Sequence, residues 1–161
     1  MDVARIPNTK FFISGYEFAQ PRNFQDIENF TKYIKNNNID TIINVSDYDP
    51  GSYIDFYKNC NVRNVIYKPF PDKILESHEY KIYITHLQRI YDTIKTLSTR
   101  NILIHCTAGI NRSALVICYL TLRMYPRGMD TIIRNVQKSN INRKKPALTN
   151  YTFVQLLLNH I

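Results

Sequence analysis

Short apolar runs rich in β-branched residues alternate along this chain with longer segments of helical periodicity. The runs are DTIINVS (residues 40–46), VRNVIYKPF (residues 62–70) and NILIHC (residues 101–106), and each predicts a buried strand. Strands that are apolar along their length, with helices between them, form largely parallel sheets covered on both faces. The alternation therefore predicts an α/β fold in which helices flank both faces of a mostly parallel central sheet.

Five segments carry the helical pattern. Apolar residues recur at intervals of three and four in the longest of them, from Ser77 to Leu97. Pro126 and Gly128 end the helix expected after Ser113, and Thr149 or Asn150 offers a side-chain cap for the last one. The predicted helices are 23–38, 77–97, 113–125, 129–139 and 150–161.

The size and composition of the chain indicate one globular domain, residues 1–161, with a single core. The longest apolar runs are too short to span a bilayer, and the opening MDVARIPNTK lacks the apolar segment of a signal peptide. Three cysteines without metal-type spacing argue against a disulfide framework or a zinc site. We therefore expect a soluble protein of a reducing compartment, the cytoplasm, with no membrane partner.

Three loops follow the carboxyl ends of the predicted strands, which is where ligands bind in open parallel sheets. They are SDYDP from residue 46, KPFPDK from residue 68 and CTAGINRS from residue 106. The formal charge of +8 favours phosphorylated or polyanionic partners, and it also fits an ordinary basic surface.

The loop from Cys106 to Ser113 is suited to hold an oxyanion. A strand that turns sharply into a helix directs several backbone N–H groups into one concavity, at the positive end of the helix dipole. Gly109 permits the unusual backbone conformation that such a turn needs, and the Arg112 guanidinium can bind two phosphate oxygens at once. In these surroundings Cys106 is favoured as a thiolate, which is the nucleophilic form of the side chain.

The stretch HCTAGINRS, residues 105–113, matches His-Cys-x-x-Gly-x-x-Arg-Ser/Thr and resembles the active-site loop of the cysteine-dependent protein phosphatases. The likeness to their small dual-specificity branch covers nearly the whole chain. FFISGYEFA resembles the opening strand and turn of that branch, IINVSD its second strand, FPD its acid loop and ALTNYTFVQLL its closing helix. Within that branch the chain resembles the poxviral members most, in having Asn111 before the arginine and in its abundance of Asn and Tyr. An insect poxvirus is the expected source.

Two features depart from the family pattern. The Arg-Pro pair usual near residue 145 is replaced by NRKKPALTN. The N-terminal helix through which some poxviral members dimerise has no counterpart, so the chain is expected to be a monomer or a homodimer. The basic run at Arg143, Lys144 and Lys145 could meet an acidic phosphoprotein, or it could be a solvated charged surface.

The loop chemistry and the resemblance together assign roles. Cys106 attacks phosphorus and Arg112 clamps the phosphate. Ser113 assists the departure of the thiolate, His105 supports the loop, and neither a metal nor a cofactor is needed. The remaining phosphate-binding groups are the backbone N–H groups of Thr107, Ala108, Gly109, Ile110 and Asn111.

A proton donor must lie on the same rim, and Asp47, Asp49 and Asp72 are the candidates by topology. A right-handed crossover through the long helix makes the strands before Asp72 and before Cys106 neighbours or near-neighbours. The resemblance also selects Asp72, because it follows KPFP where the family has its general acid. Asp72 is therefore predicted to be the general acid and base.

The expected activity is hydrolysis of phosphotyrosine and phosphoserine/threonine in proteins, in the host cytoplasm or the virion. An RNA 5′-triphosphatase with the same cysteine loop is an alternative, and so is a module that binds phosphoproteins without cleaving them. Cys60 and Cys118 are weak candidates as disulfide partners of an oxidised Cys106, and Cys118 is expected to be buried.

Overall fold

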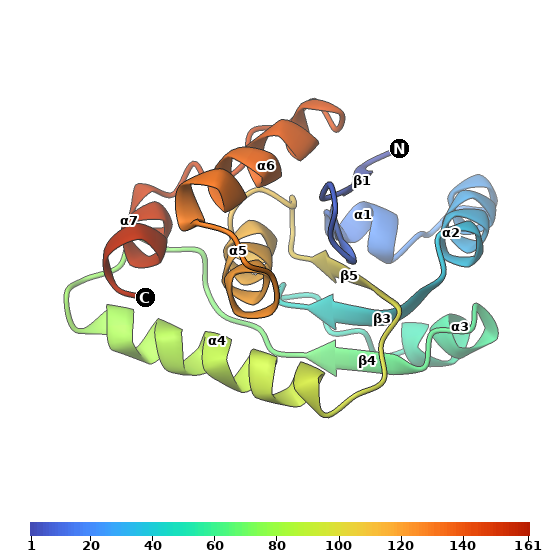
Figure 1. The fold of residues 1–161 in the computed structure, drawn as a ribbon. Coiled ribbons are helices and arrows are strands. Elements are labelled where there is room, and N and C mark those ends of the chain that lie inside the picture. The colour runs from blue at the N-terminus through green and yellow to red at the C-terminus, as the bar shows by residue number, and fades with distance from the viewer.

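A five-stranded sheet runs through the middle of the protein (Figure 1). The computed structural model describes residues 1–161, and its strand order is β1-β2-β5-β3-β4. β2, β5, β3 and β4 are parallel, and β1 pairs antiparallel with β2 at one edge. This confirms the predicted mostly parallel sheet. The strands are β1 (Val3–Arg5), β2 (Phe11–Ser14), β3 (Ile39–Asn44), β4 (Asn64–Tyr67) and β5 (Asn101–His105).

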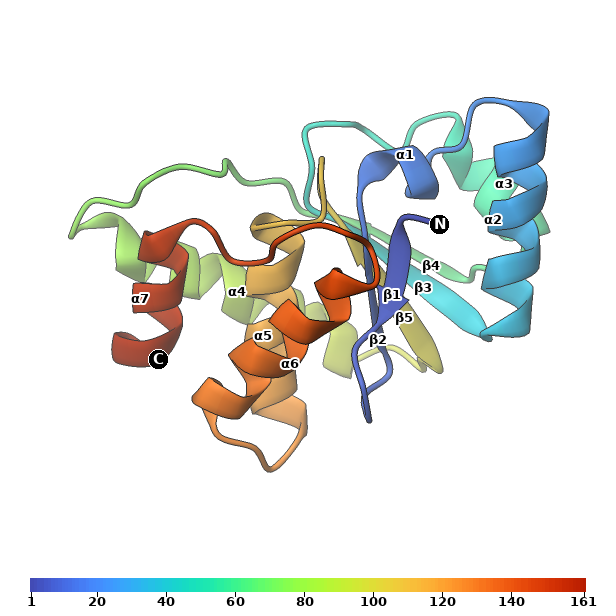
Figure 2. The same ribbon diagram turned by 90° about the horizontal axis from the view of Figure 1, so that it is seen from above.

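Helices cover both faces of the sheet, as predicted (Figure 2). One face carries three helices, α1 (Tyr16–Ala19), α2 (Phe24–Asn36) and α3 (Tyr53–Asn59). The other carries four helices, α4 (Glu79–Lys95), α5 (Arg112–Met124), α6 (Met129–Ile141) and α7 (Tyr151–Asn159).

The sheet separates two hydrophobic clusters, where the sequence led us to expect one core. Side chains alternate along each strand, so that Phe11 and Ile13 of β2 enter the larger cluster and Phe12 enters the smaller one. α5 lies at the centre of the larger cluster, and its residues 112–121 are all buried. Burial of its first turn holds the start of this helix, and with it the end of the preceding loop, in a fixed position.

Three elements were not predicted from the sequence. β1 has only three residues, α1 is a four-residue helix where only a turn was expected, and α3 is a seven-residue helix in the Tyr-rich stretch. α3 buries Tyr57, whose hydroxyl donates to the Ala19 carbonyl, so long-range packing stabilises it. The other predicted elements are present with shifts of a few residues at their ends, and Asn150 is the residue that caps α7.

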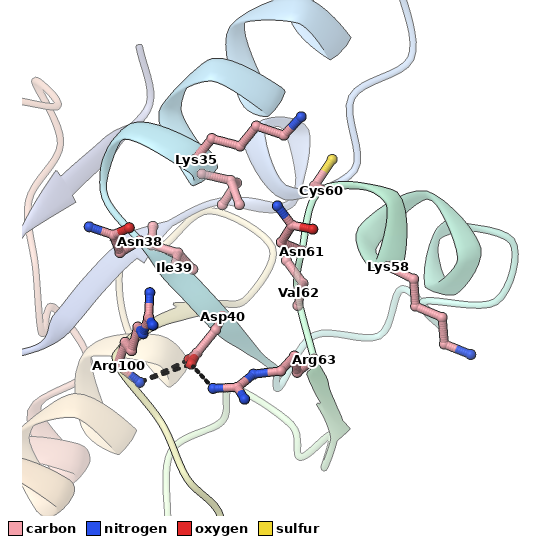
Figure 3. Close-up of a pocket in the computed structure, with 11 residues that line it drawn as sticks. Lys35, Asn38, Ile39, Asp40, Lys58, Cys60, Asn61, Val62, Arg63 and Arg100 are labelled. Carbon is pink, nitrogen blue, oxygen red and sulfur yellow. Dashed lines mark hydrogen bonds and ion pairs between the residues drawn. The ribbon is translucent and has the colours of Figure 1, made fainter.

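The two ends of the sheet differ in what surrounds them. The loops after β3, β4 and β5 lie at its carboxyl end. Near the opposite end of β3 lies a cavity with a volume of about 630 Å³ (Figure 3). No helix of the protein has the length and apolar character needed to cross a membrane.

Candidate active site

Cys106, the predicted nucleophile, lies where β5 ends and the chain turns toward α5. Its residue surface is 3% exposed. The sulfur atom lies 3.3 Å from the Ser113 hydroxyl oxygen and accepts a hydrogen bond of 3.3 Å from the Gly109 N–H. Ser113 is the second residue of α5, so the sulfur faces the N-terminal end of a 13-residue helix. That end of a helix stabilises negative charge.

The catalytic loop, residues 106–111, is held from outside by its carbonyl groups. The carbonyl oxygens of residues 107–110 accept hydrogen bonds of 2.6–3.3 Å. Tyr16 N–H donates to the Thr107 carbonyl, and Leu148 N–H donates to the Ile110 carbonyl. The Arg143 and Lys145 side chains donate to the Ala108 carbonyl. The Asn140 and Arg143 side chains donate to the Gly109 carbonyl. No hydrogen bond within the protein is donated by the N–H groups of Thr107, Ala108, Ile110 and Asn111. These N–H groups remain free to bind an oxyanion.

Arg143 corrects one reading of the sequence, in which it belonged to a solvated or protein-binding basic run. Its side chain is 0% exposed and forms an ion pair with Asp2 at 2.7 Å. It donates to the carbonyls of Ala108 and Gly109 at 2.8 and 2.6 Å. A buried guanidinium needs partners for its N–H groups, and here the catalytic loop and Asp2 supply them. Arg143 therefore braces the loop, and Lys145 joins it by contacting Asp2 at 2.9 Å.

Gly109 has the conformation that the sequence led us to expect. Its φ of 69° lies in the left-handed region, which side chains disfavour. A Cβ atom at this position would overlap the Arg143 guanidinium and lie 2.7 Å from the Ser14 carbonyl. Glycine is thus required here both by the backbone angle and by the close approach of the brace.

Arg112 brings together the three loops at the carboxyl end of the sheet. Nη1 lies 3.4 Å from an oxygen of Asp47 and 3.3 Å from the Phe70 carbonyl oxygen, and Nη2 donates to the Thr107 hydroxyl at 2.7 Å. This confirms that the loops after β3, β4 and β5 share one rim. The Asp47 side chain is 78% exposed, so its ion pair with Arg112 is weakened by solvent and a phosphate can displace it.

Asp72 contacts the catalytic loop, although β3 separates β4 from β5 in the sheet. One carboxylate oxygen accepts from the Asn111 side-chain amide at 2.9 Å, and the other accepts from the Asn150 amide at 2.9 Å. The third candidate proton donor, Asp49, accepts from Gly51 N–H within its own turn at 2.6 Å. Of the three aspartates, only Asp72 is bonded to Asn111 of the catalytic loop.

Comparison with protein families identifies this arrangement. The family described as "Dual specificity phosphatase, catalytic domain" matches residues 23–160. The chain belongs to the dual-specificity phosphatase family. It is therefore a protein phosphatase, and its phosphoprotein substrates follow from that membership. No curated protein sequence matches the chain.

Solved structures agree with the dual-specificity phosphatase fold. Human DUSP28 is 16% identical, with 98% of this chain and 90% of that chain covered and a TM-score of 0.70. Cydia pomonella PTP-2 phosphatase is 18% identical, with 98% and 88% covered and a TM-score of 0.60. A human tyrosine phosphatase-like serine/threonine/tyrosine-interacting protein is 16% identical, with 98% and 94% covered and a TM-score of 0.64. At these identities the likeness shows the fold alone.

His105 lies fully buried under the loop of this phosphatase. One ring nitrogen, Nδ1, lies 3.4 Å from the Cys106 carbonyl oxygen, and Nε2 has no hydrogen-bond partner. Burial lowers the pKa of His105 to about 4, so the ring is neutral at pH 7. A neutral, enclosed imidazole fits the predicted supporting role and does not supply charge to a substrate.

Two tyrosines that the sequence did not single out stand beside the catalytic loop. Tyr16 and Tyr48 stack with ring centroids 4.0 Å apart and an interplanar angle of 9°. Tyr16 N–H donates to the Thr107 carbonyl, and Tyr48 follows Asp47, which pairs with Arg112. The stacked pair therefore joins the segment after β2 to the loop after β3.

The other two cysteines are free and buried. Cys60 packs in the smaller hydrophobic cluster, across the sheet from the cluster that includes Cys106. Cys118 lies on α5, fully enclosed, and burial raises the pKa of its thiol. Burial of Cys118 was predicted, and the enclosure of both thiols disfavours attack on an oxidised Cys106.

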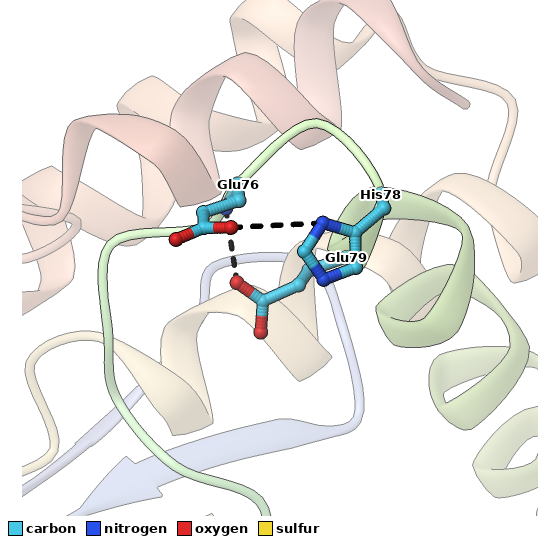
Figure 4. Close-up of side chains that lie close together, drawn as sticks. All are labelled: Glu76, His78 and Glu79. Atoms are coloured by element: carbon cyan, nitrogen blue, oxygen red, sulfur yellow. Dashed lines mark hydrogen bonds and ion pairs between the residues drawn. The ribbon is translucent and has the colours of Figure 1, made fainter.

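One group of side chains has donor atoms close enough to hold a metal ion (Figure 4). The donor atoms of Glu76, His78 and Glu79 lie within 4.8 Å of one another, at the start of α4. Glu79 already accepts from Glu76 N–H and pairs with Lys73 at 2.8 Å. Because the positive end of α4 also disfavours a cation, we assign no metal to this cluster.

Proposed function

We propose that this phosphatase hydrolyses phosphotyrosine and phosphoserine/threonine through a cysteinyl-phosphate intermediate. The observation that carries the proposal is the arrangement around Cys106. Its sulfur lies beneath a loop whose carbonyls are bonded from outside and whose N–H groups, except that of Gly109, are free. Such a site binds the oxygens of a phosphoryl group with a nucleophile positioned below phosphorus.

In the first step Cys106 Sγ attacks phosphorus, an S–P bond forms, and the bond from phosphorus to the substrate oxygen breaks. Arg112 leaves Asp47 and binds two equatorial oxygens, which the N–H groups of residues 107–112 also contact. Asp72, in its protonated form, gives its proton to the leaving oxygen.

In the second step water attacks the phosphocysteine, and Asp72, now a carboxylate, accepts the proton of that water. The S–P bond breaks and its electron pair returns to sulfur. The Ser113 hydroxyl, 3.3 Å from the sulfur, donates to the departing thiolate and stabilises it. Inorganic phosphate then leaves, and no metal or cofactor takes part.

The contacts of the three aspartates support Asp72 as the acid. Asp47 is engaged with Arg112 and Asp49 with its own turn. Asp72 is bonded to Asn111, one residue before Arg112. This bond to the catalytic loop supports the proposal that Asp72 protonates the leaving oxygen.

Replacement of the nucleophile tests the proposal directly. Cys106→Ser is expected to abolish release of phosphate from aryl phosphates and from phosphopeptides, because the seryl hydroxyl is a far weaker nucleophile. The variant should still bind vanadate or phosphopeptide, since the loop donors are untouched. Turnover retained by Cys106→Ser would contradict a cysteinyl-phosphate mechanism.

An RNA 5′-triphosphatase is the second enzymatic candidate, because the positive charge and the Asn before the arginine also fit it. Its leaving group is a phosphate, which scarcely needs protonation. The placement of Asp72 against the loop favours the protein phosphatase. Equal rates for Asp72→Ala and wild type on every substrate, including triphosphorylated RNA, would favour the RNA enzyme instead.

A phosphoprotein-binding module without catalysis is a further candidate, and one structure of similar fold is described as a tyrosine phosphatase-like serine/threonine/tyrosine-interacting protein. The retained Cys106 and its hydrogen-bonded surroundings favour catalysis. Binding of a phosphopeptide without any vanadate-sensitive release of phosphate would establish the binding role.

The source and location of the protein are part of the proposal. Asn111 and the Asn- and Tyr-rich composition support a poxviral member, acting in the host cytoplasm or carried in the virion. A gene located among those of a large DNA virus would support this assignment, and a gene in a cellular chromosome would contradict it.

A further inference from the structure

One cavity of the protein lies away from the catalytic loop. It opens between the C-terminal ends of α2 and α3 and the beginning of β3 (Figure 3). Its volume of about 630 Å³ is within the range of sites that hold a ligand or a peptide side chain. β3 runs from this cavity, at Ile39, to the catalytic end of the sheet, at Asn44. The two sites are therefore separated by roughly 17 Å along the strand.

The cavity has an apolar floor. Ile34, Ile39, Cys60 and Val62 line it, and each of these residues is at most 3% exposed. They belong to the smaller hydrophobic cluster, so the floor is an extension of the core. Because these side chains are almost entirely covered, the floor closes the cavity and offers a ligand little accessible apolar surface.

The rim of the cavity is strongly basic. Four cationic side chains line it, against one carboxylate, that of Asp40, which leaves a surplus of three positive charges. Asp40 is buried and accepts from Arg100 N–H and from the Arg63 guanidinium at 3.0 and 3.1 Å. Only Arg63 among the cations forms an ion pair, and its side chain is 60% exposed. The cations are Lys35, Lys58, Arg63 and Arg100.

The arginines are the stronger indication of a ligand. Lys35 and Lys58 lie in the last turns of α2 and α3, where a cation is already favourable for the helix dipole, and Figure 3 shows Lys58 directed away from the other rim residues. Arg100 has no such explanation, because the hydrogen bonds to Asp40 come from its backbone and its guanidinium has no partner. Arg63 keeps further donors free after its bond to Asp40.

We propose that this cavity is a docking site for an acidic segment of the protein substrate, whose carboxylates bind the basic rim. The surplus of cationic side chains on the rim is complementary to the carboxylates of such a peptide. A segment bound here would be joined to the phosphorylated residue by at least about six extended residues. It would raise the effective concentration of that residue at the catalytic loop.

Peptide binding can be measured without turnover, so the docking site can be tested separately from catalysis. Only the effect of docking on the reaction rate rests on the proposed function. The probe is a fluorescein-labelled, unphosphorylated peptide with a central leucine between pairs of glutamates, followed by anisotropy. The test variant is Arg63→Gln/Arg100→Gln, and Arg100→Gln alone leaves every contact of Asp40 in place. The control with the same change of charge is Arg134→Gln/Lys138→Gln on the exposed side of α6.

We expect wild type and the control to bind the peptide, and the test variant to bind about tenfold more weakly. Raising the salt concentration from about 0.05 to about 0.5 M should weaken binding to wild type. A phosphopeptide carrying the acidic segment should have a lower KM than one without it, and the test variant should lose that difference while keeping wild-type kcat on p-nitrophenyl phosphate.

Three results would overturn the proposal. The first is that wild type does not bind the peptide. The second is that the test and control variants bind it equally weakly. The third is that inorganic phosphate protects the protein from thermal unfolding through Arg63 and Arg100, whereas the peptide does not. The last would mean that a small anion occupies the cavity. Failure of the catalytic proposal would appear differently, as unchanged turnover in Cys106→Ser.

Discussion

At the scale of single residues, the site depends on side chains whose partners fix what they can do. Asp72 is held by two amide groups, Arg112 by groups from three loops, and His105 by enclosure in the core. Substrate binding must therefore break or use the contacts that hold Asp72 and Arg112.

Asp72→Asn should lower kcat most for substrates with poor leaving groups. A positioned acid contributes about 10²- to 10⁴-fold, so we expect a loss in that range for phosphothreonine peptides and a smaller loss for p-nitrophenyl phosphate, whose phenolate leaves without full protonation. The ratio of kcat between the two substrates is the measurement.

Asp49→Asn is the matched control, because Asp49 contacts only its own turn. A uniform loss across leaving groups for Asp72→Asn, or the same discrimination in Asp49→Asn, would remove Asp72 from the role of acid.

His105 should make stability depend on pH. Burial lowers its pKa to about 4 in the folded protein, against about 6.5 when unfolded. Between these values the unfolded chain binds a proton that the folded protein does not, so the free energy of unfolding falls as pH falls from about 6.5 to about 4. The total should be about 3 kcal/mol, present above pH 6.5 and lost on acidification.

Urea unfolding of wild type and His105→Gln at several pH values measures this contribution. The variant should show a shallower decline below pH 6.5, whereas His160→Gln, which alters an exposed histidine, should follow wild type. Parallel pH profiles for wild type and His105→Gln would show that the ring is not held neutral.

At the scale of elements, the start of α7 links helix formation to the acid loop. The Asn150 side-chain oxygen accepts from Thr152 N–H and caps the helix, while its amide donates to Asp72 and to the Lys73 carbonyl. One residue thus serves both as a helix cap and as a support for Asp72.

Asn150→Ser should separate these two tasks. Serine caps helices about as well as asparagine, so the free energy of unfolding should change by less than about 1 kcal/mol. Loss of the amide donor should lower kcat several-fold on phosphothreonine peptides and less on p-nitrophenyl phosphate. Thermal unfolding and steady-state kinetics measure the two effects.

Asn150→Ala is the comparison, because it should lose the cap and the amide together. Wild-type kcat in Asn150→Ser would show that Asn111 alone is sufficient to position Asp72.

At the scale of the whole molecule, the N-terminal segment meets the segment after α6 behind the catalytic loop. Asp2 and Arg143 are 141 residues apart in sequence and form a buried ion pair. Removing one partner of a buried pair costs about 3–5 kcal/mol, and partial exposure of Asp2, at 26%, reduces that cost.

Asp2→Asn should therefore lower the free energy of unfolding by about 2 kcal/mol, and it should weaken inhibition by vanadate several-fold because Arg143 holds the loop carbonyls. Urea unfolding and the vanadate inhibition constant are the measurements. Asp130→Asn, at an exposed acidic residue in the first turn of α6, should change neither. A vanadate constant equal to wild type in Asp2→Asn would show that the loop does not depend on the pair.

The limits of prediction from sequence follow from the range of the interactions. The strands at 40–46 and 101–106 and the loop at 105–113 could be predicted because their signals, β-branched runs and a spaced motif, are local. The Asp2 contact, the bond from Asn150 to Asp72 and the role of Arg143 could not be predicted, because they depend on which distant segments the fold brings behind the loop. β1 and α3 were missed for the same reason, since each is too short to be stable without its tertiary contacts.

The support of the catalytic loop by carbonyl contacts has a consequence for protein engineering. The nine residues HCTAGINRS, transplanted to a strand–helix junction of another scaffold, should not reproduce the anion site. Their conformation is imposed by groups at residues 2, 16, 140, 143, 145 and 148, none of which would travel with the insert. A designer would have to transfer the surrounding hydrogen-bond donors before the motif could adopt this conformation.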